Sequence, residues 1–331
     1  MTVAVFSTKP HDRAYFDLFN NQQHTLTYFD STLNADTTNL TVGFDAVCVF
    51  VNDKIDAPTI EKLARNGIKI IALRCTGFNN IDLDAAKNNH IKVVRVPAYS
   101  PEAVAEHAVA LILTLNRKTH KAYNRVRESN FSLDKLVGFN LHGKTVGVIG
   151  TGKIGAAFCT IMLGFGCKVI AFDPVESDVL KQKGVDYQSL SDVLATSDII
   201  SLHCPLMPIT QHLINAKALS KMKKGAMLIN TSRGGLIDTA AVIAALKKEQ
   251  LGYLGIDVYE QEAQLFFKDL SGSIIQDDVI QRLLTFHNVL ITPHQGFFTK
   301  EALEQIATTT LKNLTDFENK RLLKNEVIAV A

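Results

Sequence analysis

The sequence predicts an α/β protein of two domains, each built on a parallel β-sheet. Its 331 residues exceed what one ordinary hydrophobic core holds. Short runs rich in Val and Ile alternate with helical patterns along most of the chain, which is typical of parallel sheets covered by helices. In addition, an apolar run within residues 144–155 meets glycines in G-x-G-x-x-G spacing, and a helical pattern follows without a break.

Residues 1–100 are predicted to form the smaller domain. The expected strands are residues 3–6, 26–29, 46–51, 68–73 and 91–96, and the expected helices are residues 13–19, 58–65 and 83–88. Asp82 before one helix and Gly67 after another suit an N-cap and a C-cap. This part of the sequence contains no glycine pattern for binding phosphate.

The chain is predicted to cross between domains near residue 100. Pro97 and Pro101 bracket Tyr99, and residues 102–119 then form a long helical pattern with little polar content. A helix that is apolar on most of its circumference has to be buried between layers or at a subunit contact. We expect this helix to contribute to a dimer interface, with an ordinary core helix as the alternative.

The glycine segment predicts a dinucleotide site. Gly150 allows a tight turn, Gly152 lets the backbone approach a pyrophosphate, and Gly155 lets the helix pack close to the strand. The N-terminus of the following helix offers unpaired N–H groups to the anion. Asp173 ends the next apolar run, roughly 20 residues after the glycines, where a carboxylate can bind an adenosine ribose.

The remaining elements extend the same sheet. Further strands are expected at residues 185–187, 198–203, 226–230, 253–257 and 289–292, and helices at 190–195, 216–222 and 239–248. A last helix at 299–317 and a tail at 321–331 are expected to return to the smaller domain. The predicted domains are therefore residues 1–100 with 299–331, and residues 101–298. Ligands of such a doubly wound sheet gather at the C-terminal ends of its strands.

Chemically useful side chains follow these strands. Arg233 follows one strand and has a guanidinium that could hold a carboxylate in bidentate fashion. Acids cluster after the next strand, and His294 follows the last. Each residue alone has an ordinary structural explanation, but together they supply a carboxylate clamp, a partner for the imidazole and a proton donor. These are the parts required to reduce a 2-keto acid with a nicotinamide. Cys204, Pro205 and Thr210 follow the strand at 198–203 and are expected to line the cofactor cleft.

The composition argues against several classes of partner. A net charge of +2, with Lys and Arg scattered among Asp and Glu, gives no footprint for nucleic acid. The longest apolar run, residues 108–115, is too short to span a membrane, and the N-terminus lacks the basic region of a secretion signal. The five cysteines lack metal-ligand spacing. We expect a soluble cytoplasmic protein without metal, nucleic-acid partner or membrane association.

The chain resembles the D-isomer-specific 2-hydroxyacid dehydrogenases and, within them, the NAD-dependent fermentative D-lactate dehydrogenases of bacteria. The resemblance runs nearly the whole length, and its motifs lie at residues 73–82, 94–107, 147–155, 230–234, 257–260 and 292–294. It implies a Rossmann-type doubly wound nucleotide domain and a smaller, flavodoxin-like α/β substrate domain. The expected reaction is the reduction of pyruvate to D-lactate with NADH.

The resemblance also implies roles for individual residues. Arg233 would bind and polarise the keto acid, His294 would be the acid/base, and Glu262 would pair with His294. The cofactor would contact Gly150, Gly152, Lys153, Ile154, Gly155, Asp173, Cys204, Pro205, Thr210, Thr231, Ser232 and Asp257. In the smaller domain, backbone N–H groups near Thr76 and Gly77 would hold the carboxylate, while Tyr99 and Phe297 would close the pocket.

Several alternatives stay open at this point. Asp173, followed by Pro174 and without a nearby arginine, favours NAD over NADP, since a 2′-phosphate would meet a like charge. The substrate could instead be a larger 2-keto acid or hydroxypyruvate. A corepressor-like protein that senses NAD(H) is a further alternative, because a fold does not imply a function. The family suggests a homodimer, with a tetramer as the alternative, and the sequence assigns no role to residues 260–285.

Overall fold

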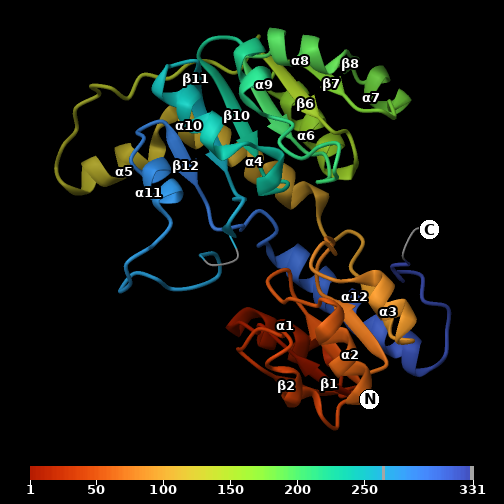
Figure 1. Ribbon diagram of the computed structural model, residues 1–331. Coiled ribbons are helices and arrows are strands. Elements are labelled where there is room, and N and C mark those ends of the chain that lie inside the picture. The colour runs from red at the N-terminus through yellow and green to blue at the C-terminus, as the bar shows by residue number, and fades with distance from the viewer. Residues whose placement is uncertain (263–264, 329–331) are drawn as a thin grey trace. The chain divides into compact units, whose positions relative to one another are not determined.

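The computed structural model describes residues 1–262 and 265–328, and the chain divides into two compact units (Figure 1). One unit consists of Met1–Ser100 together with the chain from Phe297 onward, and the other is Pro101–Gly296. Phe297 and Phe298, which we predicted in the larger domain, therefore belong to the first unit. The chain crosses between the units twice, directly before Pro101 and directly after Gly296.

The first unit contains a five-stranded parallel sheet in the order β2-β1-β3-β4-β5, the order of flavodoxin-like folds. The strands are β1 (Thr2–Val5), β2 (Thr25–Tyr28), β3 (Ala46–Val49), β4 (Ile70–Leu73) and β5 (Lys92–Arg95). The helices are α1 (Pro10–Asn20), α2 (Ala57–Arg65), α3 (Leu83–Asn88) and α12 (Lys300–Glu318), with a 3-10 turn, η1 (Thr38–Thr41). Asp56 and Asp82 cap α2 and α3 by accepting hydrogen bonds from Thr59 N and Ala85 N.

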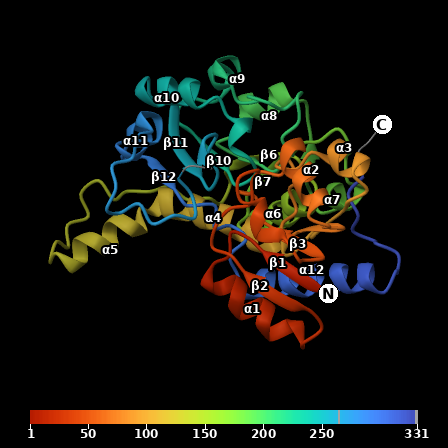
Figure 2. The ribbon, with the colours of Figure 1, turned by 60° about the horizontal axis from the view of Figure 1, so that its bottom comes forward.

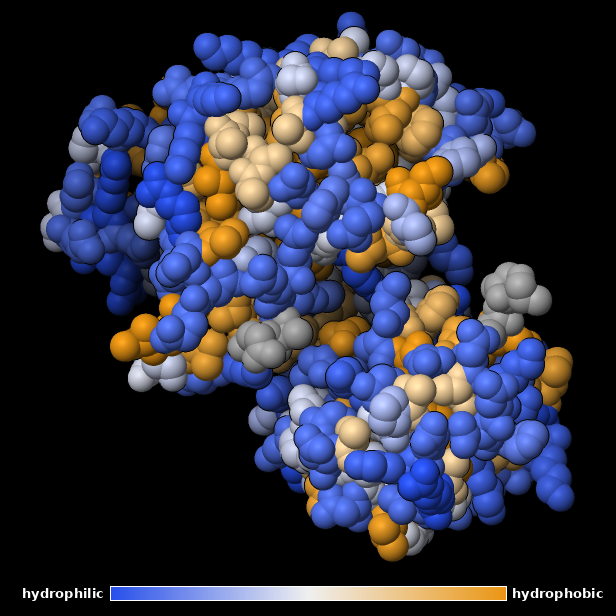
Figure 3. All heavy atoms as spheres, viewed as in Figure 1, coloured by the Kyte–Doolittle hydropathy of each residue, from blue (hydrophilic) through white to orange (hydrophobic). Residues whose placement is uncertain are grey.

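Alternation along the strands creates two cores in this unit. Val3 and Val5 of β1 pack with Phe16 of α1 and Leu314 of α12, whereas Ala4 belongs to the core beneath α2. Helices α1 and α12 therefore cover one face of the sheet, and α2 and α3 cover the other. Hydrophilic residues occupy most of this unit's surface in the view of Figure 3.

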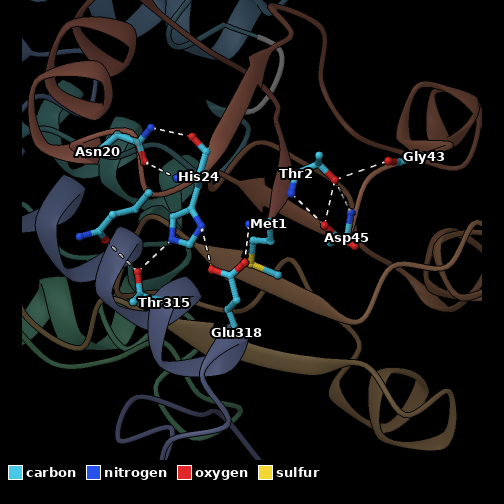
Figure 4. Close-up of polar contacts among 9 residues, drawn as sticks. Met1, Thr2, Asn20, His24, Gly43, Asp45, Thr315 and Glu318 are labelled. Carbon is cyan, nitrogen blue, oxygen red and sulfur yellow. Dashed lines mark hydrogen bonds and ion pairs between the residues drawn. The ribbon is translucent and has the colours of Figure 1, made fainter.

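Polar contacts join the last long helix to the start of the chain (Figure 4). The N-terminal ammonium of Met1 lies 2.6 Å from Glu318 Oε1, and His24 Nε2 lies 2.9 Å from Thr315 Oγ1. His24 Nδ1 is 3.5 Å from the other oxygen of Glu318. These contacts add to the apolar packing of Leu311 and Leu314, which makes α12 part of the first unit.

The second unit contains a seven-stranded parallel sheet in the order β12-β11-β10-β9-β6-β7-β8. The strands are β6 (Thr145–Ile149), β7 (Lys168–Phe172), β8 (Asp186–Tyr187), β9 (Ile199–Leu202), β10 (Ala226–Asn230), β11 (Leu251–Ile256) and β12 (Val289–Ile291). The strand order reverses at the β6/β9 pair, so the sheet is doubly wound, as predicted. Ligands bind such sheets at the carboxyl ends of the strands near this reversal.

Helices cover both faces of this sheet. They are α4 (Pro101–Arg117), α5 (Thr119–Arg127), α6 (Lys153–Gly164), α7 (Asp178–Gln182), α8 (Leu190–Thr196), α9 (Ala216–Lys221), α10 (Thr239–Lys247) and α11 (Asp278–Leu284), with a 3-10 turn, η2 (Gly234–Leu236). Side chains of α4 and α6 belong to one core, and those of α8 to α11 belong to the other. Among the described residues, no helix combines the length and apolar character that crossing a bilayer requires.

The predicted helix at 102–119 differs from the structure. It ends at Arg117, because Lys118 adopts a left-handed conformation with φ of +50°, and α5 begins directly afterwards. Nine residues of α4 are buried, whereas α5 buries none. The core that α4 shares with α6 accounts for the apolar residues on its buried face, and a part for α4 in a dimer interface stays a prediction. The strongly exposed apolar side chains lie farther along the chain, at Phe131, Leu133 and Val137.

Candidate active site

The glycine turn joins β6 to α6 at the reversal of the strand order. Gly150 has φ of +94°, and a Cβ on it would lie 2.5 Å from Cys204 N, so only glycine fits this position. A Cβ on Gly155 would collide with the carbonyl oxygen of Gly150. Gly152 has no heavy atom within 4 Å of its Cβ position, and as the N-cap of α6 it offers no side-chain cap. The space beside Gly152 lets a ligand approach the first turn of this 12-residue helix, where unpaired N–H groups can bind an anion.

Asp173 directly follows β7 and is held beside the glycine turn. Its Oδ2 accepts a hydrogen bond of 2.6 Å from Thr151 N, and its Oδ1 accepts one of 2.9 Å from Val175 N. The Tyr187 hydroxyl donates to Thr151 Oγ1 at 2.8 Å, which ties β8 to the same turn. The carboxylate has no ion-pair partner among the described residues, so its negative charge is available to discriminate between ligands.

The segments after β9 and β10 are also joined. Ser232 Oγ donates to the Cys204 carbonyl at 2.7 Å, and Thr210 Oγ1 donates to the Pro205 carbonyl at 2.7 Å. Thr231 is 8% exposed, and its hydroxyl is buried without a hydrogen-bond partner among the described residues. A buried hydroxyl in this state is costly unless a ligand satisfies it. The open glycine turn and this unsatisfied hydroxyl are compatible with a dinucleotide bound at the strand ends.

His294 and Glu262 form a contact at the next strand ends. Nδ1 of His294, after β12, lies 2.9 Å from Oε1 of Glu262, after β11. Tyr259 N donates to the other carboxylate oxygen at 3.0 Å, so the carboxylate is itself held in place. The two side chains are 17% and 24% exposed. Nε2 of His294 is the nitrogen left for a ligand, and the Glu262 contact orients it.

Arg233 follows β10, the strand that neighbours β11 in the sheet. Its Nη1 donates to its neighbour's carbonyl, Ser232 O, at 2.7 Å. Gly234 packs so closely against the backbone of Tyr259 and Glu260 that a Cβ would not fit. Across the described chain, no carboxylate lies within ion-pair distance of Arg233. A guanidinium that is anchored but has no anionic partner can bind an anionic ligand.

Asp257 is buried at the end of β11, with 1% exposure. Its carboxylate accepts hydrogen bonds from Gln295 N at 2.9 Å and Gly296 N at 2.7 Å, and also from the Thr292 hydroxyl. Burial raises its pKa, but hydrogen bonds from His107, Thr292 and Gln295 outweigh burial, so the net pKa is lowered. Hydrogen bonds from within the protein thus reach both oxygens of this carboxylate. A contact between Asp257 and the cofactor stays a prediction.

The predicted substrate residues of the first unit lie after β4 and β5 and at the second crossing. Arg95 Nη1 donates to the Thr76 carbonyl at 2.8 Å, and Cys75 Sγ contacts the Gly77 carbonyl at 3.2 Å. The Tyr99 and Phe297 rings pack with centroids 6.2 Å apart. These contacts order the segments, while the contact of Thr76, Gly77, Tyr99 and Phe297 with substrate stays a prediction.

Sequence reasoning missed Arg74, which supports the segment containing Thr76. Arg74 is 1% exposed, and its guanidinium donates to Asp12, to the Phe6 carbonyl and to the Ser7 carbonyl at 2.9 to 3.4 Å. The sequence signal that could have drawn attention to Arg74 is its position directly after the apolar strand β4. Its partners lie more than 60 positions away, so the sequence alone did not show what it binds.

Comparison with known proteins agrees with this geometry. Residues 109–296 match the family described as D-isomer specific 2-hydroxyacid dehydrogenase, NAD binding domain. The chain belongs to this family and is an NAD-dependent 2-hydroxyacid dehydrogenase. The predicted fold class, family and cofactor are thus confirmed.

Individual relatives match the chain from end to end. The 2-hydroxyacid dehydrogenase A of Aspergillus oryzae is 55% identical over 332 residues, which cover 99% of this chain and 95% of the relative. The D-lactate dehydrogenase of Escherichia coli is 52% identical over 329 residues, covering 99% and 100%. The apo structure of D-lactate dehydrogenase from Escherichia coli superposes with a TM-score of 0.91 at 50% identity, covering 99% and 100%. D-lactate dehydrogenase from Aquifex aeolicus, solved with NAD and lactic acid, has a TM-score of 0.89 at 36% identity, covering 99% and 100%.

Proposed function

We propose that this protein reduces pyruvate to D-lactate with NADH, and catalyses the reverse reaction as well. The observation that carries the proposal is the hydrogen bond between His294, which follows β12, and Glu262, which follows β11. Strand β11 lies between β12 and β10, the strand that precedes Arg233. The relatives named D-lactate dehydrogenase support lactate as the product, and one of them was solved with NAD and lactic acid.

In the proposed mechanism the chain binds the keto acid and moves one proton. Arg233 holds the carboxylate and draws electron density from the keto oxygen. His294 gives a proton from Nε2 to that oxygen, and takes it back in the reverse reaction. Glu262 accepts a hydrogen bond from Nδ1 and so keeps Nε2 pointed at the substrate. Bound NADH supplies the two electrons and the hydrogen that the keto carbon receives.

The nucleotide is proposed to bind along the glycine turn. Gly152, Lys153, Ile154 and Gly155 at the start of α6 would contact the pyrophosphate. Asp173 would accept hydrogen bonds from the adenosine ribose, and its charge would repel a 2′-phosphate. Cys204, Pro205, Thr210, Thr231 and Ser232 would line the remainder of the site, with the unsatisfied Thr231 hydroxyl as a hydrogen-bond donor.

A steady-state assay tests this proposal. NADH oxidation is measured with pyruvate, hydroxypyruvate and a branched 2-keto acid, and pyruvate is expected to give the highest kcat/KM. A higher kcat/KM with another acid would favour the related dehydrogenase. Tight NADH binding without turnover on any of the three would favour the corepressor-like alternative.

Two substitutions test the assigned roles. His294→Gln should lower kcat for pyruvate by about 100-fold or more, because it removes the proton donor. Arg233→Lys keeps the charge but loses the bidentate fork, so it should raise KM and lower kcat together. NADH affinity serves as the control in both variants and should stay near that of the wild type. Unchanged pyruvate kinetics in either variant would place that role elsewhere.

A homodimer is the proposed assembly. Figures 1 and 2 both show α5 and the segment after it extending away from the rest of the second unit. Phe131, Leu133 and Val137 in this segment are 72%, 82% and 82% exposed. Apolar groups gathered on an extended arm are typical of a subunit contact. Sedimentation should give a dimer that Val137→Asp weakens; a wild-type monomer would refute the assembly, and a tetramer would extend it.

The cytoplasm is proposed as the location, since all five cysteines are free and buried.

A further inference from the structure

A histidine outside the proposed catalytic set lies beside the second crossing of the chain. His107 belongs to α4, which begins at the first crossing, and its Nε2 lies 3.0 Å from Thr292 Oγ1 and 3.3 Å from Asp257 Oδ1. The side chain of His107 is only 15% exposed. The contacts connect helix α4 with the ends of β11 and β12, more than 140 positions along the chain.

The direction of these hydrogen bonds follows from the number of protons. The Thr292 hydroxyl has one proton, which it donates to the Asp257 carboxylate. Thr292 Oγ1 therefore faces His107 as an acceptor, and Nε2 of His107 is the donor. The result is a chain of donors that runs from His107 through Thr292 to Asp257.

Asp257 connects His107 and Thr292 with the backbone just before the second crossing. Its two oxygens accept hydrogen bonds from the N–H groups of Gln295 and Gly296, the two residues after His294. A Cβ on Gly296 would lie 3.0 Å from Asp257 Oδ2 and 3.5 Å from Cδ2 of His107. The backbone at Gly296 thus rests directly on both side chains.

His294 occupies a backbone conformation that needs such support. Its φ is +57°, in the left-handed region that non-glycine residues rarely adopt. Its N–H donates to the Thr292 carbonyl at 3.0 Å, and Thr292 is the residue that His107 contacts. Residues in such conformations persist only where the surroundings determine them. Glu262 fixes the ring, while the group His107, Thr292 and Asp257 fixes the backbone on both sides.

We infer that His107 is a positioning residue for this reaction: its hydrogen bond to Thr292 sets the backbone of His294 and thereby the place from which His294 gives its proton. The inference rests on the proposed function for its catalytic readout. It assigns His107 no contact with substrate or cofactor.

Two substitutions at one position separate the hydrogen bond from the bulk of the side chain. His107→Leu keeps a comparable volume and removes the donor, whereas the amide N–H of His107→Gln can reach the place of Nε2. His287→Leu is the matched control, because His287 is an exposed residue just before β12 in the same unit. The pair Thr292→Val and Thr292→Ser makes the same comparison at the next residue. The valine variant loses the hydroxyl that bonds His107 and Asp257, and the serine variant keeps it.

The kinetic expectation is a loss in kcat alone. His107→Leu should lower kcat for pyruvate by up to about 100-fold, the loss that a displacement of about 1 Å in a catalytic group can cause. The KM for pyruvate and the affinity for NADH should change by less than about threefold, since Arg233 and the glycine turn are untouched. The solvent isotope effect on kcat should rise, because proton transfer becomes slower. His107→Gln should recover most of the rate.

An NMR measurement tests whether His107 positions His294 without relying on turnover. The imidazole signals of His294, assigned by their absence in His294→Gln, should shift in His107→Leu and return in His107→Gln, and His287→Leu should leave them unmoved. Unshifted signals in His107→Leu, or equal kinetic losses in the Leu and Gln variants, would overturn the positioning role. Wild-type protein that reduces none of the keto acids would instead refute the proposed function, and the NMR comparison would still judge His107.

Discussion

Replacing His203 should make the protein more resistant to acid. His203 directly follows β9, and its Nε2 lies 2.9 Å from Ser201 Oγ, with its ring packed on Phe158 at a centroid distance of 4.9 Å. It also supports the glycine turn, because a Cβ on Gly155 would lie 3.4 Å from Cβ of His203. Burial lowers the pKa of His203 from 6.5 to about 3. The ring therefore stays neutral in the folded protein at every pH at which the enzyme is expected to work.

The size of the effect follows from the two pKa values. Unfolded His203 takes up a proton near pH 6.5, whereas the folded residue takes it up only near pH 3. The stabilisation is therefore fully present above pH 6.5 and is lost as the pH falls towards 3. Between pH 7 and pH 5 the loss is about 2 kcal/mol, from about 1.4 kcal/mol per pH unit below 6.5. Part of the residue reaches solvent, so this figure is an upper limit.

Urea denaturation followed by circular dichroism measures this loss. His203→Gln keeps a donor for Ser201 but does not titrate, so its free energy of unfolding should fall less between pH 7 and pH 5 than that of the wild type. The other nine histidines are common to both proteins and cancel in the comparison. If the two proteins lose equal stability over this range, His203 is not held neutral by burial and the reasoning is wrong.

Two further predictions concern the nucleotide site. Gly155→Ala should lower the free energy of unfolding by about 2 kcal/mol and abolish NADH binding, because its Cβ meets the Gly150 carbonyl. Gly152→Ala, with open space around its Cβ, should weaken NADH binding and cost less than about 1 kcal/mol of stability, because only the N-cap preference of glycine is lost; equal unfolding midpoints for the two variants would contradict this account. Asp173→Ser should shift the kcat/KM ratio of NADPH to NADH upwards by at least about tenfold, or about 1.4 kcal/mol. An unchanged ratio would show that the Asp173 carboxylate does not discriminate against the 2′-phosphate.

The sequence predicted most strands because their signal is local. All four residues of β3 are buried, as are all four of β9, and each segment is an apolar run bounded by turn residues. Helix α11 was not predicted. Residues 278–284 are a short helix inside a segment to which the sequence assigned no role, and the helix is stabilised by Asp277 as its cap and by Ile280 and Leu283 in the core.

The residues of the candidate site were proposed on two different grounds, the ends of the strands and the resemblance to a family. Arg233 and His294 could be proposed from the sequence because the rule for strand ends applies to any parallel sheet. The partnership of Glu262 with His294 came only from family resemblance, since several acids follow β11 and spacing does not choose among them. The structure shows the 2.9 Å contact for Glu262 and a different use for Glu260, which accepts hydrogen bonds from Thr239 and His212.

By itself, the sequence determined the two parallel sheets, the glycine turn and the order in which functional side chains follow the strands, because each of these depends on neighbouring residues. Only the tertiary structure decided which distant side chains meet. His107 reads as one polar residue in an apolar helix, and nothing near it in the chain indicates Thr292 or Asp257. Such contacts arise where a helix crosses the ends of two strands, and the packing of the whole unit sets that geometry.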